Sequence, residues 1–69
     1  MINNCYDLLR YIKEHHGIQR FPADPQKEFG ISQDTFDMYI DELLNDGYIK
    51  IYLRSCGITP EGNEFLDNP

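Results

Sequence analysis

The stretch from Ser32 to Gly47 constrains the fold most, because it carries a complete helix signature. Ser32 suits the N-cap position, where its hydroxyl accepts a hydrogen bond from an amide of the first turn. Gly47 supplies the left-handed residue that closes a helix. The apolar side chains between them share an arc of roughly 140° on a helix. They are Phe36, Tyr39, Ile40, Leu43 and Leu44. We therefore expect an amphipathic helix with one side in a core.

The opposite side of this helix is acidic. Its side chains are Gln33, Asp34, Asp37, Met38, Asp41, Glu42 and Asn45, and the whole stretch contains no lysine or arginine. A run of charged residues is usually a solvent-exposed helix face that keeps a small protein soluble. The alternative is a surface that binds a protein, or that mimics nucleic-acid phosphates towards a basic partner. Met38, apolar amid the acids, is its candidate contact residue.

Three more helices are expected around this one. They span Cys5–His16, Pro25–Phe29 and Pro60–Asp67. Gly17 ends the first of them, and Ile18–Phe21 follows as a short extended segment that could form a brief strand. Asp24 before Pro25 places a cap ahead of a proline at the first helical position. The short link from the second helix to Ser32 contains Gly30, which gives the tight spacing of a helix–turn–helix.

After Gly47 the hydrophobic period changes from helical to two, which is typical of a strand. One face is apolar and carries Ile49, Ile51 and Leu53. The other face is basic and aromatic and carries Tyr48, Lys50, Tyr52 and Arg54. We expect a turn over Ser55–Gly57 that exposes Cys56, and a very short return strand at Ile58–Thr59.

With 69 residues, the chain is expected to form one α+β domain over residues 1–69. Cys5 lies on the apolar face of the first helix and is expected to be buried. The other side chains expected in the core are Leu8, Leu9, Ile12, Phe29, Phe36, Ile40, Leu43, Leu44, Ile49, Ile51 and Phe65. Gly62 is expected to weaken the last helix.

The net charge of −6, from 12 acids and 6 bases, disfavours phosphate backbones and anionic membranes unless the bases are segregated on one face. The chain has neither a long apolar run nor a signal peptide, so a cytoplasmic protein with free thiols is expected. His15 and His16 are adjacent and point about 100° apart on a helix, which does not suit one metal ion. We expect no metal, no cofactor and no enzymatic activity.

Two motifs resemble the winged-helix fold. Leu43–Ile49 reads L-L-N-D-G-Y-I and is similar to the usual exit from the third helix into the first wing strand. Ile58–Leu66 reads I-T-P-E-G-N-E-F-L and resembles the ending of many small winged-helix proteins, including the YjcQ-like proteins of bacteria and prophages. The resemblance implies three helices, a short β-hairpin wing and a short C-terminal helix.

The resemblance also implies DNA binding, with the helix after Ser32 in the major groove and the wing on the backbone. The acids of that helix depart from this pattern, because recognition helices usually present Arg, Lys, Asn or Gln to bases and phosphates. Only Gln33, Thr35 and Asn45 could read bases there.

Two hypotheses follow. The first is an acidic winged-helix adaptor that regulates by protein–protein contact. One version of it is a phage or prophage inhibitor that occupies the nucleic-acid site of a host factor, as anti-CRISPR proteins do. The second is a DNA-binding transcription regulator that is a homodimer and uses the wing and the first helix. Its contact residues would be Arg10, Lys13, Tyr48, Lys50, Tyr52 and Arg54.

Overall fold

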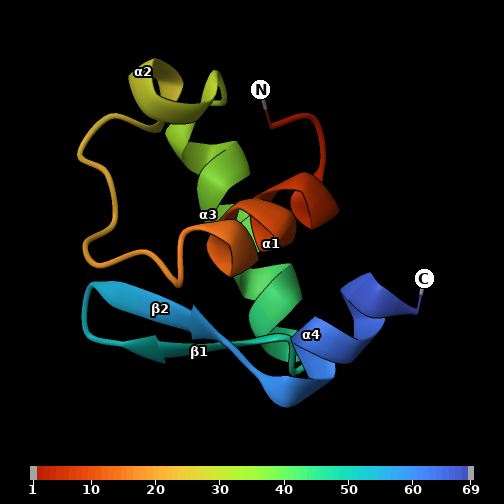
Figure 1. Ribbon diagram of the computed structural model, residues 1–69. Helices are drawn as coiled ribbons and strands as arrows, with labels where there is room; N and C mark the ends of the chain where they lie inside the picture. The colour runs from red at the N-terminus through yellow and green to blue at the C-terminus, as the bar shows by residue number, and fades with distance from the viewer. Residues whose placement is uncertain (1, 69) are drawn as a thin grey trace.

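The computed structural model describes residues 2–68, and every structural statement below concerns these residues (Figure 1). They form four helices and one two-stranded antiparallel sheet. The elements in chain order are α1 (Cys5–Glu14), α2 (Pro25–Phe29), α3 (Gln33–Asn45), β1 (Ile49–Tyr52), β2 (Ser55–Ile58) and α4 (Pro60–Asp67). The expected α+β class is confirmed, and the order of elements is compatible with a winged-helix-like arrangement.

The helices and the hairpin surround one apolar core. α1 packs against α3, the hairpin contacts both helices, and α2 covers α3 at the other end (Figure 1). Phe36 is 1% exposed and lies between two rings, with its ring centroid 5.9 Å from that of Phe29 and 5.6 Å from that of Phe21. The expected core side chains of α1, which are Leu8, Leu9 and Ile12, are fully buried.

Local capping sets the helix boundaries close to those expected. The Ser32 hydroxyl accepts from the Thr35 amide at 3.1 Å, and α3 runs from the next residue. Gly47 has a φ of 78°, and beyond it the Tyr48 amide donates to the Leu43 carbonyl at 3.0 Å. α2 and α4 have the expected bounds, whereas α1 ends two residues early, at Glu14.

The hairpin turn lies two residues earlier than expected. Leu53 and Arg54 form the turn, and Leu53 has a φ of 57° with its side chain 97% exposed. The turn expected at Ser55–Gly57 is wrong because Cys56 is held extended on both sides. It pairs with Ile51 in β1, and it exchanges two backbone hydrogen bonds with Ile18, of 3.0 and 2.9 Å.

The observed burial differs from the expected core at several positions. Cys56 is 5% exposed and is part of the core instead of an exposed turn. Leu44, expected in the core, is 41% exposed at the edge of the apolar arc of α3. Ile51 and Phe65 are only partly buried against the core, and besides Cys56 three isoleucines are buried that were not expected in the core. These three are Ile2, Ile18 and Ile31.

A buried hydroxyl joins the exit of α3 to the start of α4. Thr59 is 4% exposed, donates to the Gly47 carbonyl at 2.6 Å and accepts from the Gly62 amide at 3.0 Å. The chain thus passes close to Gly62, where an added Cβ would lie 2.3 Å from the Tyr48 carbonyl oxygen. Glycine is therefore required there by space, in addition to its cost in helix propensity. Among the described residues, no helix has the length and apolar character needed to cross a membrane.

Gly62→Ala should destabilise the protein although alanine is the better helix former. Its Cβ would meet backbone at Tyr48, and overpacking of this kind costs about 1–3 kcal/mol. Gly57→Ala is the matched control, because a Cβ there meets nothing within 4 Å. Urea denaturation of the two variants should separate them, and equal midpoints would contradict the close approach at Gly62.

Phe36→Ala should cost about 3–5 kcal/mol of unfolding free energy, because it removes a fully buried ring that two other rings contact. A loss of that size approaches the whole stability of a small domain. The measurement is thermal denaturation followed by circular dichroism, and wild-type stability in the variant would refute the packing of α3.

Candidate functional site

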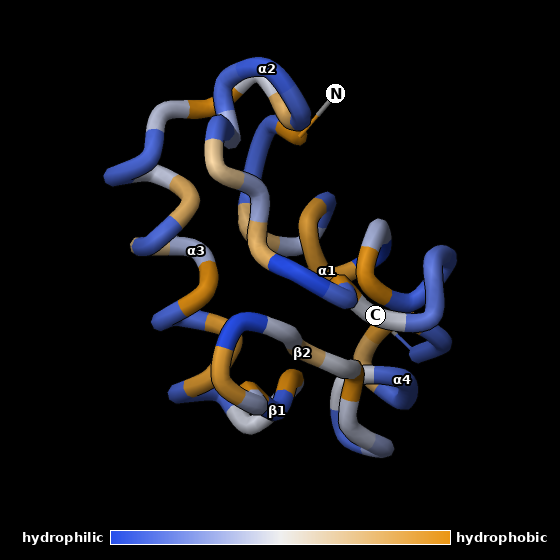
Figure 2. Tube along the Cα trace, turned by 90° about the vertical axis from the view of Figure 1, so that its left-hand side faces the viewer, coloured by the Kyte–Doolittle hydropathy of each residue, from blue (hydrophilic) through white to orange (hydrophobic). Residues whose placement is uncertain are grey.

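The outward side of α3 is an acidic surface. We use that name for Gln33, Asp34, Asp37, Met38, Asp41, Glu42 and Asn45. All seven side chains are exposed, including Met38 at 58%. Figure 2 shows the hydrophilic residues of α3 along its outer edge and the hydrophobic ones towards the interior. The structure therefore brings together the residues expected on this face of the helix.

The carboxylates of this surface have few internal partners. Asp37 accepts a hydrogen bond from the Gln33 amide group at 2.9 Å, within the same helix. In the part of the chain that the structure describes, the one ion pair joins Lys13 to Asp67, so no base neutralises the acids of α3. Unpaired carboxylates on one face create a negative potential that attracts a basic partner.

Glu42 marks the edge of the acidic surface nearest to α1. Burial raises the pKa of the Cys5 thiol most, and a hydrogen bond to the Glu42 carboxylate raises it further. Together these effects move this pKa from 9.0 to about 11. Burial likewise raises the pKa of the Cys56 thiol. Both thiols are therefore protonated and unreactive at neutral pH, as expected of structural cysteines.

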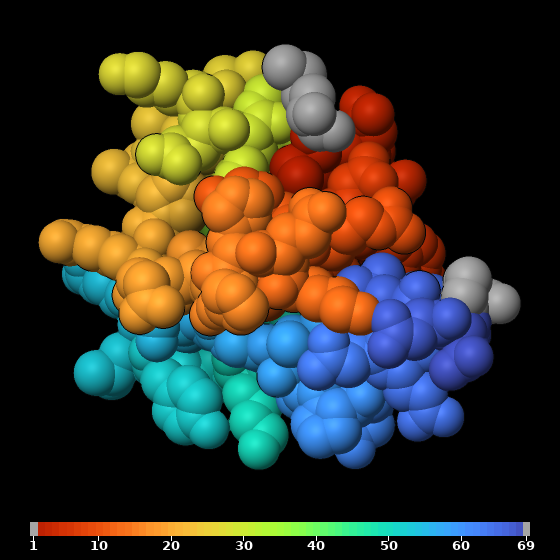
Figure 3. All heavy atoms as spheres, viewed as in Figure 1, coloured from red at the N-terminus to blue at the C-terminus, as the bar shows by residue number. Residues whose placement is uncertain are grey.

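The residues of the alternative nucleic-acid contact do not form one surface. Arg10 is exposed on α1, and Lys13 on the same helix is ion-paired with Asp67 of α4, whose side chains lie against those of α1 in Figure 3. The hairpin turn with Arg54 lies at the far end of the sheet from α4 (Figure 1). These bases thus fall into two groups.

Within the hairpin, the expected basic and aromatic face is also divided. Tyr48 is half-buried and its ring stacks on that of Phe65, with centroids 4.7 Å apart. Lys50 and Tyr52 are exposed on β1. Arg54 belongs to the turn and lines a cavity together with Arg20. Sequence reasoning missed this partnership, because it placed the turn after Arg54 and left Ile18–Phe21 unpaired.

Among residues 2–68, no group of three or more His, Cys, Asp or Glu side chains is arranged to hold a metal ion. Comparison of the chain with protein-family models, with curated proteins and with solved structures finds no match.

The raised thiol pKa values predict that stability falls at alkaline pH. Between pH 9 and about 11 the unfolded Cys5 thiol loses its proton while the folded one keeps it. The unfolded state then binds fewer protons, so the unfolding free energy decreases as the pH rises through this window. Denaturation midpoints measured from pH 8 upwards test this slope.

Cys5→Ala is the control for the alkaline slope, because tyrosines titrate in the same range. Its slope should be shallower than that of the wild type, whatever its absolute stability. Identical slopes would contradict the burial of the thiol beside Glu42.

Proposed function

We propose that the protein is a small winged-helix adaptor that acts by binding another protein through the acidic surface, without catalysis. The observation that carries the proposal is the exposure of every side chain of that surface on the helix that faces outward. Four carboxylates there are not ion-paired, and Met38 is 58% exposed among them. An apolar centre with a polar rim is the common arrangement of a protein-binding patch.

The charge of α3 favours a basic protein over DNA. Docking this helix in a major groove would desolvate Asp34, Asp37 and Asp41 beside phosphates with no base of the helix to offset them. The same carboxylates repeat along one helix face, as phosphates repeat along a strand. A concrete form of the proposal is an inhibitor that occupies the nucleic-acid site of a basic host factor, as a phage-encoded protein would.

A DNA-binding regulator is the second candidate. Lys50 and Tyr52 favour it, because both are exposed on the outer strand of the hairpin. The DNA-binding function would be supported over the adaptor if the protein binds a DNA duplex at low salt and loses it steeply as the salt concentration rises.

Charge reversal tests the adaptor. The triple variant Asp34→Lys, Asp37→Lys and Asp41→Lys should keep its fold. It should no longer capture the partner protein that the wild-type chain captures from a lysate of the source cells. The loss follows because three attractive charges become repulsive ones. Affinity capture followed by mass spectrometry measures it.

The matched control is the triple variant Glu14→Lys, Glu61→Lys and Glu64→Lys. It changes the net charge equally, at exposed acids of α1 and α4, and like the test variant it includes one acid in the first turn of a helix. The control should retain the partner. If both triple variants behave alike, net charge and not the acidic surface governs binding, and the proposal fails.

A further inference from the structure

The segment after α1 is joined to the outer edge of β2 by an isolated β-bridge. Ile18 exchanges both backbone hydrogen bonds with Cys56, and the Phe21 amide donates to the Arg54 carbonyl at 2.7 Å. This pairing brings Arg20 and Phe21 alongside Arg54. Arg20 and Arg54 line the same cavity, so two positively charged side chains share one part of the surface.

One acid, Glu28, lines a neighbouring cavity together with Arg20 but forms no ion pair with it. Neither arginine forms an ion pair within residues 2–68, and both side chains are exposed. The chain carries only six bases against twelve acids, so the placement of two arginines together is a local reversal of its overall charge. Both guanidinium groups can therefore donate charge-assisted hydrogen bonds to an anion from outside the chain.

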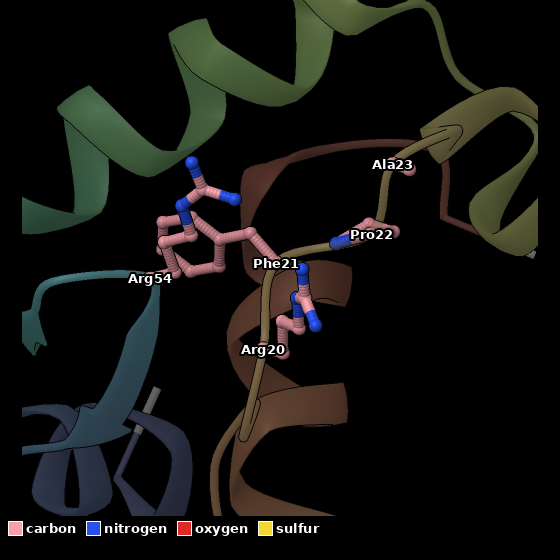
Figure 4. Close-up of a pocket in the computed structure, with 5 residues that line it drawn as sticks. All are labelled: Arg20, Phe21, Pro22, Ala23 and Arg54. Atoms are coloured by element: carbon pink, nitrogen blue, oxygen red, sulfur yellow. The ribbon is translucent and has the colours of Figure 1, made fainter.

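The arginines flank an aromatic ring in a cavity. The cavity has a volume of about 490 Å³ and is lined by Arg20, Phe21, Pro22, Ala23 and Arg54. In Figure 4 the Arg54 guanidinium lies on the α3 side of the Phe21 side chain, and the Arg20 guanidinium lies on its other side. Phe21 is half-buried, and its ring is held edge-on against Phe36.

A second cavity continues the first. It has a volume of about 410 Å³, shares Arg20 and Pro22 with the first, and reaches Tyr11, His15 and Glu28. The His15 ring stacks on Tyr11 with centroids 3.8 Å apart, and its Nδ1 lies 2.9 Å from the Tyr11 carbonyl oxygen. The two cavities together form a groove along the loop, which we call the arginine groove.

We propose that the arginine groove binds single-stranded nucleic acid. Arg54 and Arg20 contact successive phosphates, one base lies on Phe21 and Pro22, and a neighbouring base lies on the exposed His15 ring. Cations alternating with aromatic rings form the platform that single strands use, because every base presents a stacking face. A duplex keeps its bases paired inside, and an acidic peptide has no such face, so neither would use the rings.

This site is separate from the acidic surface, and it does not rest on the proposed adaptor function. None of the residues of the acidic surface lines either cavity. The two proposals can therefore fail independently. If both hold, the protein joins a strand at the groove to a protein at α3.

Fluorescence anisotropy with a labelled oligothymidylate of about 8 nucleotides tests the groove. The full chain should bind this strand more tightly than a duplex of the same length or an oligoglutamate peptide. With two phosphates contacted, the logarithm of the association constant should fall with the logarithm of salt at a slope of about −1.4. Equal binding of the duplex or the peptide would overturn the proposal, as would no binding at millimolar protein.

Variants locate the binding. Arg20→Gln and Arg54→Gln should each weaken it about three- to tenfold and make the salt slope shallower by about 0.7. Arg10→Gln removes the same charge from α1 outside both cavities and should leave the affinity unchanged. If Arg10→Gln weakens binding as much as Arg20→Gln, diffuse charge explains it and the groove does not.

Phe21→Leu tests stacking while keeping an apolar side chain against Phe36. Its affinity for the strand should fall at least about fivefold. Should this variant unfold, amide chemical shifts of the wild type on titration with the strand decide the matter. They should move at Gln19–Ala23 and Arg54, and shifts confined to other residues would overturn the proposal.

Discussion

Cys56 lies between two backbone partners, and much of the molecule depends on that fact. On one side it pairs with Ile51 and completes the hairpin, and on the other it holds Ile18 by two hydrogen bonds. Gly17 permits this approach, because a Cβ there would lie 2.7 Å from the Cys56 carbonyl oxygen. The pairing buries the Cys56 thiol and fixes the loop that follows α1, so the core and the arginine groove share one origin.

The helices could be predicted from sequence because their determinants are local. Ser32, Asp24 and Thr59 each accept a hydrogen bond from the amide three residues ahead, and the adjoining apolar spacing selects the buried side. The acidic surface follows from the same periodicity, since the side opposite a buried arc must face outward. Leu44 was misplaced because it lies at the margin of that arc, where the hairpin does not cover it.

The hairpin was harder, because its turn is set by distant residues. Ser55, Cys56 and Gly57 have the composition of a turn, yet the partners of Cys56 lie in β1 and beyond α1. Leu53 occupies the turn instead, at a positive φ that bulky side chains rarely adopt. The cavity that Arg20 and Arg54 line together could not be predicted for the same reason. A single sequence shows which residues favour turns, but it does not show which of them pair with a distant strand instead.

The structure separates charge of opposite sign on adjoining parts of a small molecule. Among residues 2–68, neither the carboxylates of α3 nor the arginines beside Phe21 form an ion pair. Both groups lower the stability of the protein when no ligand is bound, and a small domain has little stability to lose. External ligands of opposite charge would remove both costs.

The bridge between Ile18 and Cys56 also has a kinetic consequence. It joins residues far apart in the chain, so its loop-closure entropy must be overcome before its two hydrogen bonds form. The caps of α1 and α3 are local and can form early. The bridge between Ile18 and Cys56 can form only after the hairpin has packed against the end of α1. In the native ensemble, the edge beside β2 should therefore open at lower free energy than the helix core, and hydrogen exchange would register it first.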